Sequence, residues 1–126
     1  MTTPQTPLRI QVVSVPVSDQ ERARRFYTET LGFEVVTDAP FGEGQRWLEV
    51  RPPGSPASFT LVTWFEEMPP GSMHGLVLAT ADIRAAFGAL KDRGVAFDQE
   101  VTEAPWGVFT TFSDPDGNSF VLTQSQ

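Results

Sequence analysis

The feature that most constrains the fold is a short pattern that occurs twice, with the two copies separated by half the length of the chain. Ser18-Asp19-Gln20-Glu21 opens a segment that ends at Leu31-Gly32-Phe33, and Ala81-Asp82-Ile83-Arg84 opens a second that ends at Arg93-Gly94-Val95. Asp19 and Asp82 are 63 positions apart in a chain of 126 residues. A duplicated supersecondary unit predicts two similar halves with a cleft between them, where equivalent positions converge on one ligand.

The length and composition set the class of protein. A chain of 126 residues buries enough surface to fold as one domain, 1–126, without a disulfide or a structural metal. It contains no cysteine, which removes thiol chemistry and agrees with a reducing compartment. Residues 1–9 lack the apolar core of a signal peptide, and no stretch approaches the ~18 apolar residues of a membrane span. We therefore expect a soluble, cytoplasmic protein.

The charge balance limits the partners. Nine Lys and Arg stand against 16 Asp and Glu, so the net charge is −7. Phosphate binding needs a basic face, which argues against nucleic acid. A neutral or cationic small molecule is the expected partner, although acidity also serves solubility alone.

Hydrophobic periodicity predicts the same order of elements in each half. In the first half a capping box from Ser18 to Glu21 predicts the helix start, and Gly32 its end. The predicted elements are strands at 10–17, 33–37, 46–51 and 58–65 with a helix at 18–31, then strands at 75–80, 95–101, 108–113 and 119–123 with a helix at 83–93. A linker, 66–73, separates unit 9–65 from unit 74–124. The predicted class is α+β, with two tandem βαβββ units, each a curved mixed sheet with a helix on its outer face, enclosing a cleft.

Three motifs resemble those of the vicinal oxygen chelate superfamily, which includes glyoxalase I, bleomycin-resistance proteins and extradiol dioxygenases. They are Phe26-Tyr27 with Leu31-Gly32-Phe33, Leu90-Lys91 with Gly94-Val95, and the turn Asp114-Pro115-Asp116-Gly117-Asn118. The resemblance covers about Ile10 to Leu122 and implies the βαβββ duplication. The scaffold serves isomerases, dioxygenases, thiol transferases and ligand-sequestering proteins. Members commonly form dimers, so a homodimer is expected, with the cleft closed within one chain or between two.

The resemblance also locates the metal ligands of the family's enzymes. These enzymes hold a divalent metal through His or Glu in the first and last strand of each unit. The matching residues here are Val12, Thr60, Gly75 and Val121, which are poor or impossible ligands. We therefore expect no metal and no other cofactor, with a divalent metal as the alternative. His74, the only histidine, is one residue from a ligand position and faces the other way, which favours a structural or exposed role.

Strand alternation from these positions predicts the cleft face. Matching Val50 to Phe112 sets the register of the third strand. The expected ligand-binding residues are Val12, Ser14, Trp47, Glu49, Thr60, Val62, Trp64, Gly75, Trp106, Phe109, Thr111 and Val121. Those expected to face the helices are Val13, Val15, Val17, Phe59, Leu61, Leu76, Leu78, Phe120 and Leu122.

Glu49 is the single carboxylate predicted on the cleft face. It is a candidate general base, or in its ionised form a partner for a ligand cation. The structural alternative is a position at the rim, hydrogen-bonded to Arg46, Arg51 or solvent. The aromatic residues that could stack on a planar ligand, or instead fill the core or a dimer interface, are Phe41, Trp47, Trp64, Trp106 and Phe109.

These residues predict a metal-free protein that binds a small planar or cationic molecule in an aromatic-lined cleft. The alternatives are a divalent-metal-dependent lyase or dioxygenase of the same superfamily, and a metal-free enzyme using Glu49. A non-catalytic interaction module is a further class, which no residue pattern specifically supports.

Overall fold

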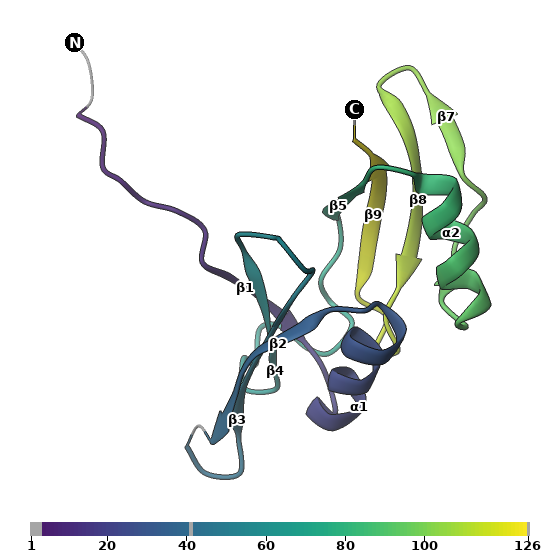
Figure 1. The fold of residues 1–126 in the computed structure, drawn as a ribbon. Helices are drawn as coiled ribbons and strands as arrows, with labels where there is room; N and C mark the ends of the chain where they lie inside the picture. The colour runs from purple at the N-terminus through teal and green to yellow at the C-terminus, as the bar shows by residue number, and fades with distance from the viewer. Residues whose placement is uncertain (1–3, 41, 126) are drawn as a thin grey trace.

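Two mixed β-sheets and two α-helices make up the folded part of the described chain (Figure 1). The computed structural model describes residues 4–40 and 42–125. The strand order is β1-β4-β3-β2 in the first sheet and β5-β9-β8-β6 in the second, where β7 also pairs with β8. The α+β class predicted from the repeat is confirmed.

The bounds of the elements follow the predicted order. The first sheet contains β1 (Val12–Pro16), β2 (Glu34–Pro40), β3 (Arg46–Arg51) and β4 (Ser58–Val62). The second contains β5 (Leu76–Thr80), β6 (Ala96–Phe97), β7 (Thr102–Ala104), β8 (Gly107–Ser113) and β9 (Ser119–Gln124). The helices are α1 (Gln20–Arg25), continued by a π-helical turn over Phe26–Thr30, and α2 (Ile83–Asp92).

The same connectivity repeats in both sheets. β1 pairs with β4 in parallel, and β5 pairs with β9 in parallel. The remaining strands of each sheet pair antiparallel, as short connections allow. In Figure 1, α1 lies on the side of the first sheet turned toward the second, and α2 covers the far side of the second sheet.

The repeated aspartates are the N-caps of the two helices. Asp19 accepts a hydrogen bond from the backbone N–H of Arg22 (3.0 Å), and Asp82 accepts one from that of Ala85 (3.1 Å). The capping box predicted from Ser18 and Glu21 is therefore wrong. The Ser18 hydroxyl instead donates to Asp116 (2.6 Å), and Glu21 pairs with Arg46 (3.1 Å), so both side chains make tertiary contacts.

The predicted strand at 95–101 is also wrong in extent. Only Ala96 and Phe97 pair with β8, and a separate strand, β7, follows. Between them the Asp98 N–H donates to the carbonyl of Thr111 (2.9 Å), and the Thr110 hydroxyl donates to the carbonyl of Gln99 (2.9 Å). These contacts fix the segment between β6 and β7 in an irregular conformation, so the strand is not continuous.

A shared hydrophobic core lies between the sheets and the helices. All nine residues predicted to face the helices belong to it or pack against it. The rings of Phe59 and Phe120 stack with centroids 5.9 Å apart, and those of Phe112 and Phe120 with centroids 5.3 Å apart. Since Phe59 belongs to the first sheet and Phe120 to the second, the core joins the two units.

A buried polar cluster joins the same units. The Tyr27 hydroxyl donates to Asp114 Oδ2 (2.8 Å), and Asn118 Nδ2 donates to the carbonyl of Pro16 (2.7 Å) and to Asp114 Oδ2 (2.8 Å). Tyr27 and Asn118 are fully buried. Burial, followed by the neighbouring Asp114 carboxylate, raises the pKa of Tyr27 well above its ordinary value. The turn at 114–118 thus anchors the second unit on β1 and on the π-helical turn that continues α1.

Candidate functional site

The face of the first sheet that points away from the shared core carries a row of three polar residues. Ser14 on β1 is opposite Thr60 on β4, and Thr60 is opposite Glu49 on β3. The hydroxyls of Ser14 and Thr60 are 3.3 Å apart and share a hydrogen bond. Thr60 is 1 % exposed and Glu49 is 9 % exposed. Strand pairing alone therefore brings these three predicted residues together.

No described Lys, Arg or His forms an ion pair with Glu49. Among the described residues, Trp47 is its one hydrogen-bond donor, through Nε1 to Oε1 (3.1 Å). The nearest arginines along β3 bind elsewhere: Arg46 pairs with Asp38 and Glu21, and Arg51 pairs with Glu34. Of the partners named in the structural alternative for Glu49, the two arginines, Arg46 and Arg51, are thus wrong. A carboxylate in this position favours a donor or a cation supplied by a ligand.

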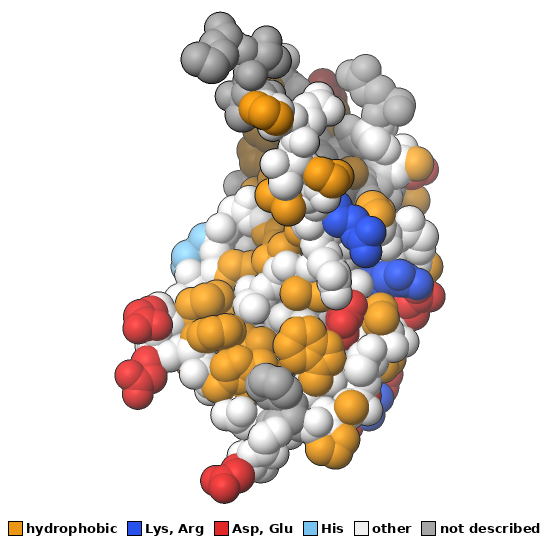
Figure 2. Space-filling model, turned by 90° about the vertical axis from the view of Figure 1, so that its left-hand side faces the viewer, with side chains coloured by type: hydrophobic (Ala, Val, Ile, Leu, Met, Phe, Trp, Pro, Cys, Tyr) orange, Lys and Arg blue, Asp and Glu red, His pale blue; other side chains and the backbone are white. Residues whose placement is uncertain are grey.

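The surroundings of this row are apolar. Val62, on the same face of β4, is 2 % exposed, and Val12 and Trp47 are partly buried. The first sheet is on the left-hand side of Figure 1, which faces the viewer in Figure 2. Figure 2 shows hydrophobic side chains gathered across the middle of this side, with most acidic side chains at its margin.

The second sheet carries the equivalent row. Val77 on β5 is opposite Val121 on β9, which is opposite Thr111 on β8. The Thr111 hydroxyl donates to Asp98 Oδ2 (2.9 Å). Val77 is 57 % exposed, so this face is open to solvent in the single chain.

The remaining predicted residues lie around these rows. The rings of Trp106 and Phe109 are tilted, with centroids 4.8 Å apart, and Trp106 is 65 % exposed. Trp64 follows the end of β4 and contacts Phe65, with ring centroids 6.2 Å apart. Gly75 is exposed and directly precedes β5. Phe41 lies outside the described residues.

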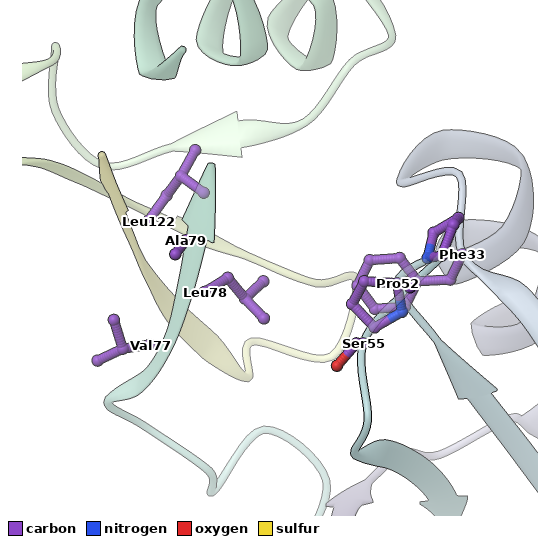
Figure 3. A pocket seen from close by; sticks show the side chains of 9 residues that line it. Phe33, Pro52, Ser55, Val77, Leu78, Ala79 and Leu122 are labelled. Carbon is purple, nitrogen blue, oxygen red and sulfur yellow. The ribbon is translucent and has the colours of Figure 1, made fainter. Parts of the chain in front are cut away.

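The twelve predicted residues thus form two sets, one on each sheet, and not one continuous wall. A crevice of about 480 Å³ lies at the junction of the units, and other residues line it (Figure 3). Phe33, Pro52 and Ser55 form its first-unit side, and Val77, Leu78 and Leu122 its second-unit side. The Pro-rich run at 52–56 carries no sequence signal that it borders a cavity.

The family's metal positions offer no ligand set. Val12, Thr60, Gly75 and Val121 occupy them, and no group of three or more His, Cys, Asp or Glu that could hold a metal occurs within residues 4–40 and 42–125. His74 is exposed, and its Nδ1 is 2.8 Å from the Ser119 hydroxyl. None of the helices described is long and apolar enough to cross a membrane.

With this geometry established, comparison with known proteins defines the class. Residues 9–122 match the model of the Glyoxalase/Bleomycin resistance protein/Dioxygenase superfamily, and the chain belongs to that superfamily. The resemblance expected from the sequence motifs is confirmed.

Two solved structures and one curated relative are similar over most of the chain. TnmS3, an antibiotic binding protein from Streptomyces sp. CB03234, is 48 % identical, with a TM-score of 0.91 over 98 % of this chain and 100 % of its own. A glyoxalase/bleomycin resistance protein from the same organism is 50 % identical, with a TM-score of 0.82 over 92 % and 100 % of the two chains. YetH of Bacillus subtilis, an uncharacterized protein, is 38 % identical over 92 % of this chain and 98 % of its own.

Proposed function

We propose that this protein binds a small planar organic molecule, of the kind found among antibiotics, and that the ligand supplies a cation or a hydrogen-bond donor to Glu49. The observation that carries the proposal is a carboxylate 9 % exposed on an apolar face, with one neutral donor, Trp47, among the described residues. A hydrogen-bond donor or a cation on the ligand would give the Glu49 carboxylate a further partner besides Trp47. The similarity to the antibiotic binding protein TnmS3 supports the same class of ligand.

The proposed site is metal-free and acts by sequestration. The family's metal positions hold Val12, Thr60, Gly75 and Val121, a set without imidazole or carboxylate. The chain would act in the reducing cytoplasm, where a protein without cysteine loses nothing.

A second copy would complete the site. In one chain the Ser14–Thr60–Glu49 row and the Val77–Val121–Thr111 row lie on different sheets. In the proposed homodimer, the first-sheet face of one copy is covered by the second-sheet face of its partner. The partner's Val121, Thr111 and Phe109 then form the opposite wall of the cleft.

Fluorescence titration tests the proposal, because Trp47 lies beside Glu49. The probes are an anthracycline, which is planar and carries an ammonium group, and its neutral N-acetylated form. We expect the cationic probe to bind more tightly, and Glu49→Gln to lower its affinity about tenfold or more while the neutral probe changes little. Glu103→Gln is the matched control, since the Glu103 side chain is 78 % exposed.

Three results would contradict the proposal. One is unchanged fluorescence with every planar probe tested. Another is an equal loss of affinity for the cationic and the neutral probe in Glu49→Gln. The third is stoichiometric divalent metal in protein purified without chelator, together with a fall in thermal stability on chelation.

A metal-free enzyme using Glu49 is the second candidate, favoured by the same buried carboxylate. A general base of this kind would turn over a bound carbon acid, and Glu49→Gln would abolish turnover while binding persisted. Product formation from a bound probe therefore separates the enzyme from the binding protein.

A further inference from the structure

The Thr111 hydroxyl on the second sheet has its proton committed to one partner. It donates to Asp98 Oδ2 (2.9 Å), and because a carboxylate only accepts hydrogen bonds, the direction of this bond is fixed. The Asp98 N–H donates in turn to the carbonyl of Thr111 (2.9 Å), so two bonds hold the pair together. Since a hydroxyl has one proton and two lone pairs, Thr111 offers a further molecule only an acceptor.

A second hydroxyl on the same face is committed in the same way. Thr123 on β9 donates to the backbone carbonyl of Leu78 (3.3 Å), which is also only an acceptor. Thr123 lies two positions after Val121, which is opposite Thr111, so the two threonines lie on one face of the sheet. At both positions, β8 and β9 therefore present oxygen lone pairs and not O–H donors.

The first sheet has the same polarity at the equivalent position. Glu49 and Thr111 hold the same place in the two units, each opposite one of the family's metal positions on the last strand of its unit. A carboxylate likewise accepts hydrogen bonds and donates none. The net charge of −7 adds a long-range preference for molecules that are positive and rich in donors.

An aromatic pair beside Thr111 can hold the plane of a ligand. Phe109 lies two positions before Thr111 on β8, so both side chains lie on the same face of the sheet. The ring of Trp106 is 4.8 Å from that of Phe109 and tilted by 32°, and Trp106 is 65 % exposed. A polycyclic ring stacked on this pair would bring its edge, which carries its amino, hydroxyl or carbonyl groups, close to Thr111.

We infer that Thr111 is a specificity-determining residue, which accepts a hydrogen bond from an amino or hydroxyl group at the edge of the planar ligand. Asp98 is then the positioning residue that keeps the Thr111 hydroxyl turned for this role. The inference rests on the proposed function and narrows its ligand class to planar molecules with N–H or O–H donors at two edges, one for Glu49 and one for Thr111. A carbonyl or ether oxygen at the second edge would face the lone pairs of Thr111 and bind more weakly.

Two acridine dyes separate hydrogen-bond donors from charge. Proflavine and acridine orange are both planar tricyclic cations. The amino groups of proflavine are dimethylated in acridine orange, so there they donate no hydrogen bond. Fluorescence titration of each dye gives the ratio of the two dissociation constants, acridine orange over proflavine. A change that weakens stacking or charge attraction affects both dyes alike and leaves this ratio constant.

The variants test the acceptor and its positioning separately. Thr111→Val removes the acceptor, and we expect the ratio to fall about threefold or more, as for the loss of one neutral hydrogen bond. Thr110→Val is the matched control, since Thr110 lies on the opposite face of the same strand and donates to the carbonyl of Gln99 (2.9 Å). Asp98→Ala frees the Thr111 proton and should lower the ratio about twofold or more. Thr110→Val, and Asp98→Asn with its amide oxygen as acceptor, should each change the ratio less than about 1.5-fold.

Each contrary result has a distinct meaning. A constant ratio in Thr111→Val, with both dyes still bound, would overturn the role of Thr111 as an acceptor. An equal fall in Thr110→Val would overturn it as well, because the loss would then follow from β8 as a whole. A constant ratio in Asp98→Ala would overturn the positioning role of Asp98. A wild-type protein that binds neither dye nor the anthracycline would contradict the proposed function, whereas binding that depends on Glu49 and not on Thr111 would contradict this inference alone.

Discussion

Removal of the Tyr27 hydroxyl is expected to weaken the attachment between the two units and to lower the stability of the protein. In Tyr27→Phe, Asp114 loses one of four donors and keeps Asn118 Nδ2 and the backbone N–H groups of Asp116 and Asn118, all at 2.8–2.9 Å. A hydrogen bond to a charged group contributes about 1.5–3 kcal/mol, and Tyr27 is fully buried, so water does not replace it. For 126 residues this lowers the melting temperature by about 6–11 °C.

Thr110→Val is the matched control for this change. The Thr110 hydroxyl is equally buried but donates to a neutral carbonyl, that of Gln99 (2.9 Å). Its loss is expected to cost about 0.5–1.5 kcal/mol. Chemical denaturation measures both variants. A loss below about 0.5 kcal/mol in Tyr27→Phe would refute the reasoning, since the Asp114 carboxylate would then not need its fourth donor.

The pH dependence of the same residue provides an independent check. Tyr27 is the single tyrosine, so tyrosinate absorbance reports on it alone. The pKa of Tyr27 in the folded protein lies well above its ordinary value of 10.0. The stability that the Tyr27 hydroxyl contributes is therefore fully present below pH 10 and is lost as the pH rises toward the folded pKa. Tyrosinate should therefore form only as the protein unfolds, and the stability gap to Tyr27→Phe should narrow above pH 10. Titration of tyrosinate in the folded protein near pH 10 would contradict this.

Two further predictions concern surface charge and the linker. Hydrogen bonds from Arg24, and after it from Arg46, lower the pKa of Glu21 from 4.5 to about 2. The stability that ionised Glu21 contributes to the fold is therefore fully present above pH 4.5 and is lost as the pH falls toward 2. In acid denaturation, the difference in unfolding free energy between the wild type and Glu21→Gln should vanish across that pH range. Gly71 has φ +84°, and a Cβ there would overlap the carbonyl oxygen of Asp116. Gly71→Ala should therefore lose more stability in thermal melts than Gly32→Ala, which has φ +80° and open space around it; equal losses would show that the contact is unimportant.

Local patterns in the sequence were sufficient for the architecture. The repeat with its two aspartates predicted two similar units, and those aspartates cap both helices. Alternation along the strands assigned nine side chains to the helix side, and all nine lie in the core or against it. Such features depend on neighbours two to four residues away, which the sequence states directly.

Long-range contacts were beyond that reach. Ser18 and Glu21 fit a capping box, yet partners 98 and 25 residues away, Asp116 and Arg46, hold their side chains. The strand expected at 95–101 is interrupted because Thr110 and Thr111 on β8 bind the segment after Phe97. A local rule gives way where a distant side chain offers a better partner.

For the candidate site, the sequence by itself determined the composition: two equivalent rows of residues, one carboxylate at Glu49 and no ligand set at the family's metal positions. Only the tertiary structure decided that Arg46 and Arg51 turn to other acids and leave Glu49 with Trp47 as its one described donor. Tertiary packing also placed the two rows on separate sheets and formed a crevice between the units. The physical reason is that ion pairing and domain packing are set by which side chains meet across space, whereas strand alternation is set by the backbone alone.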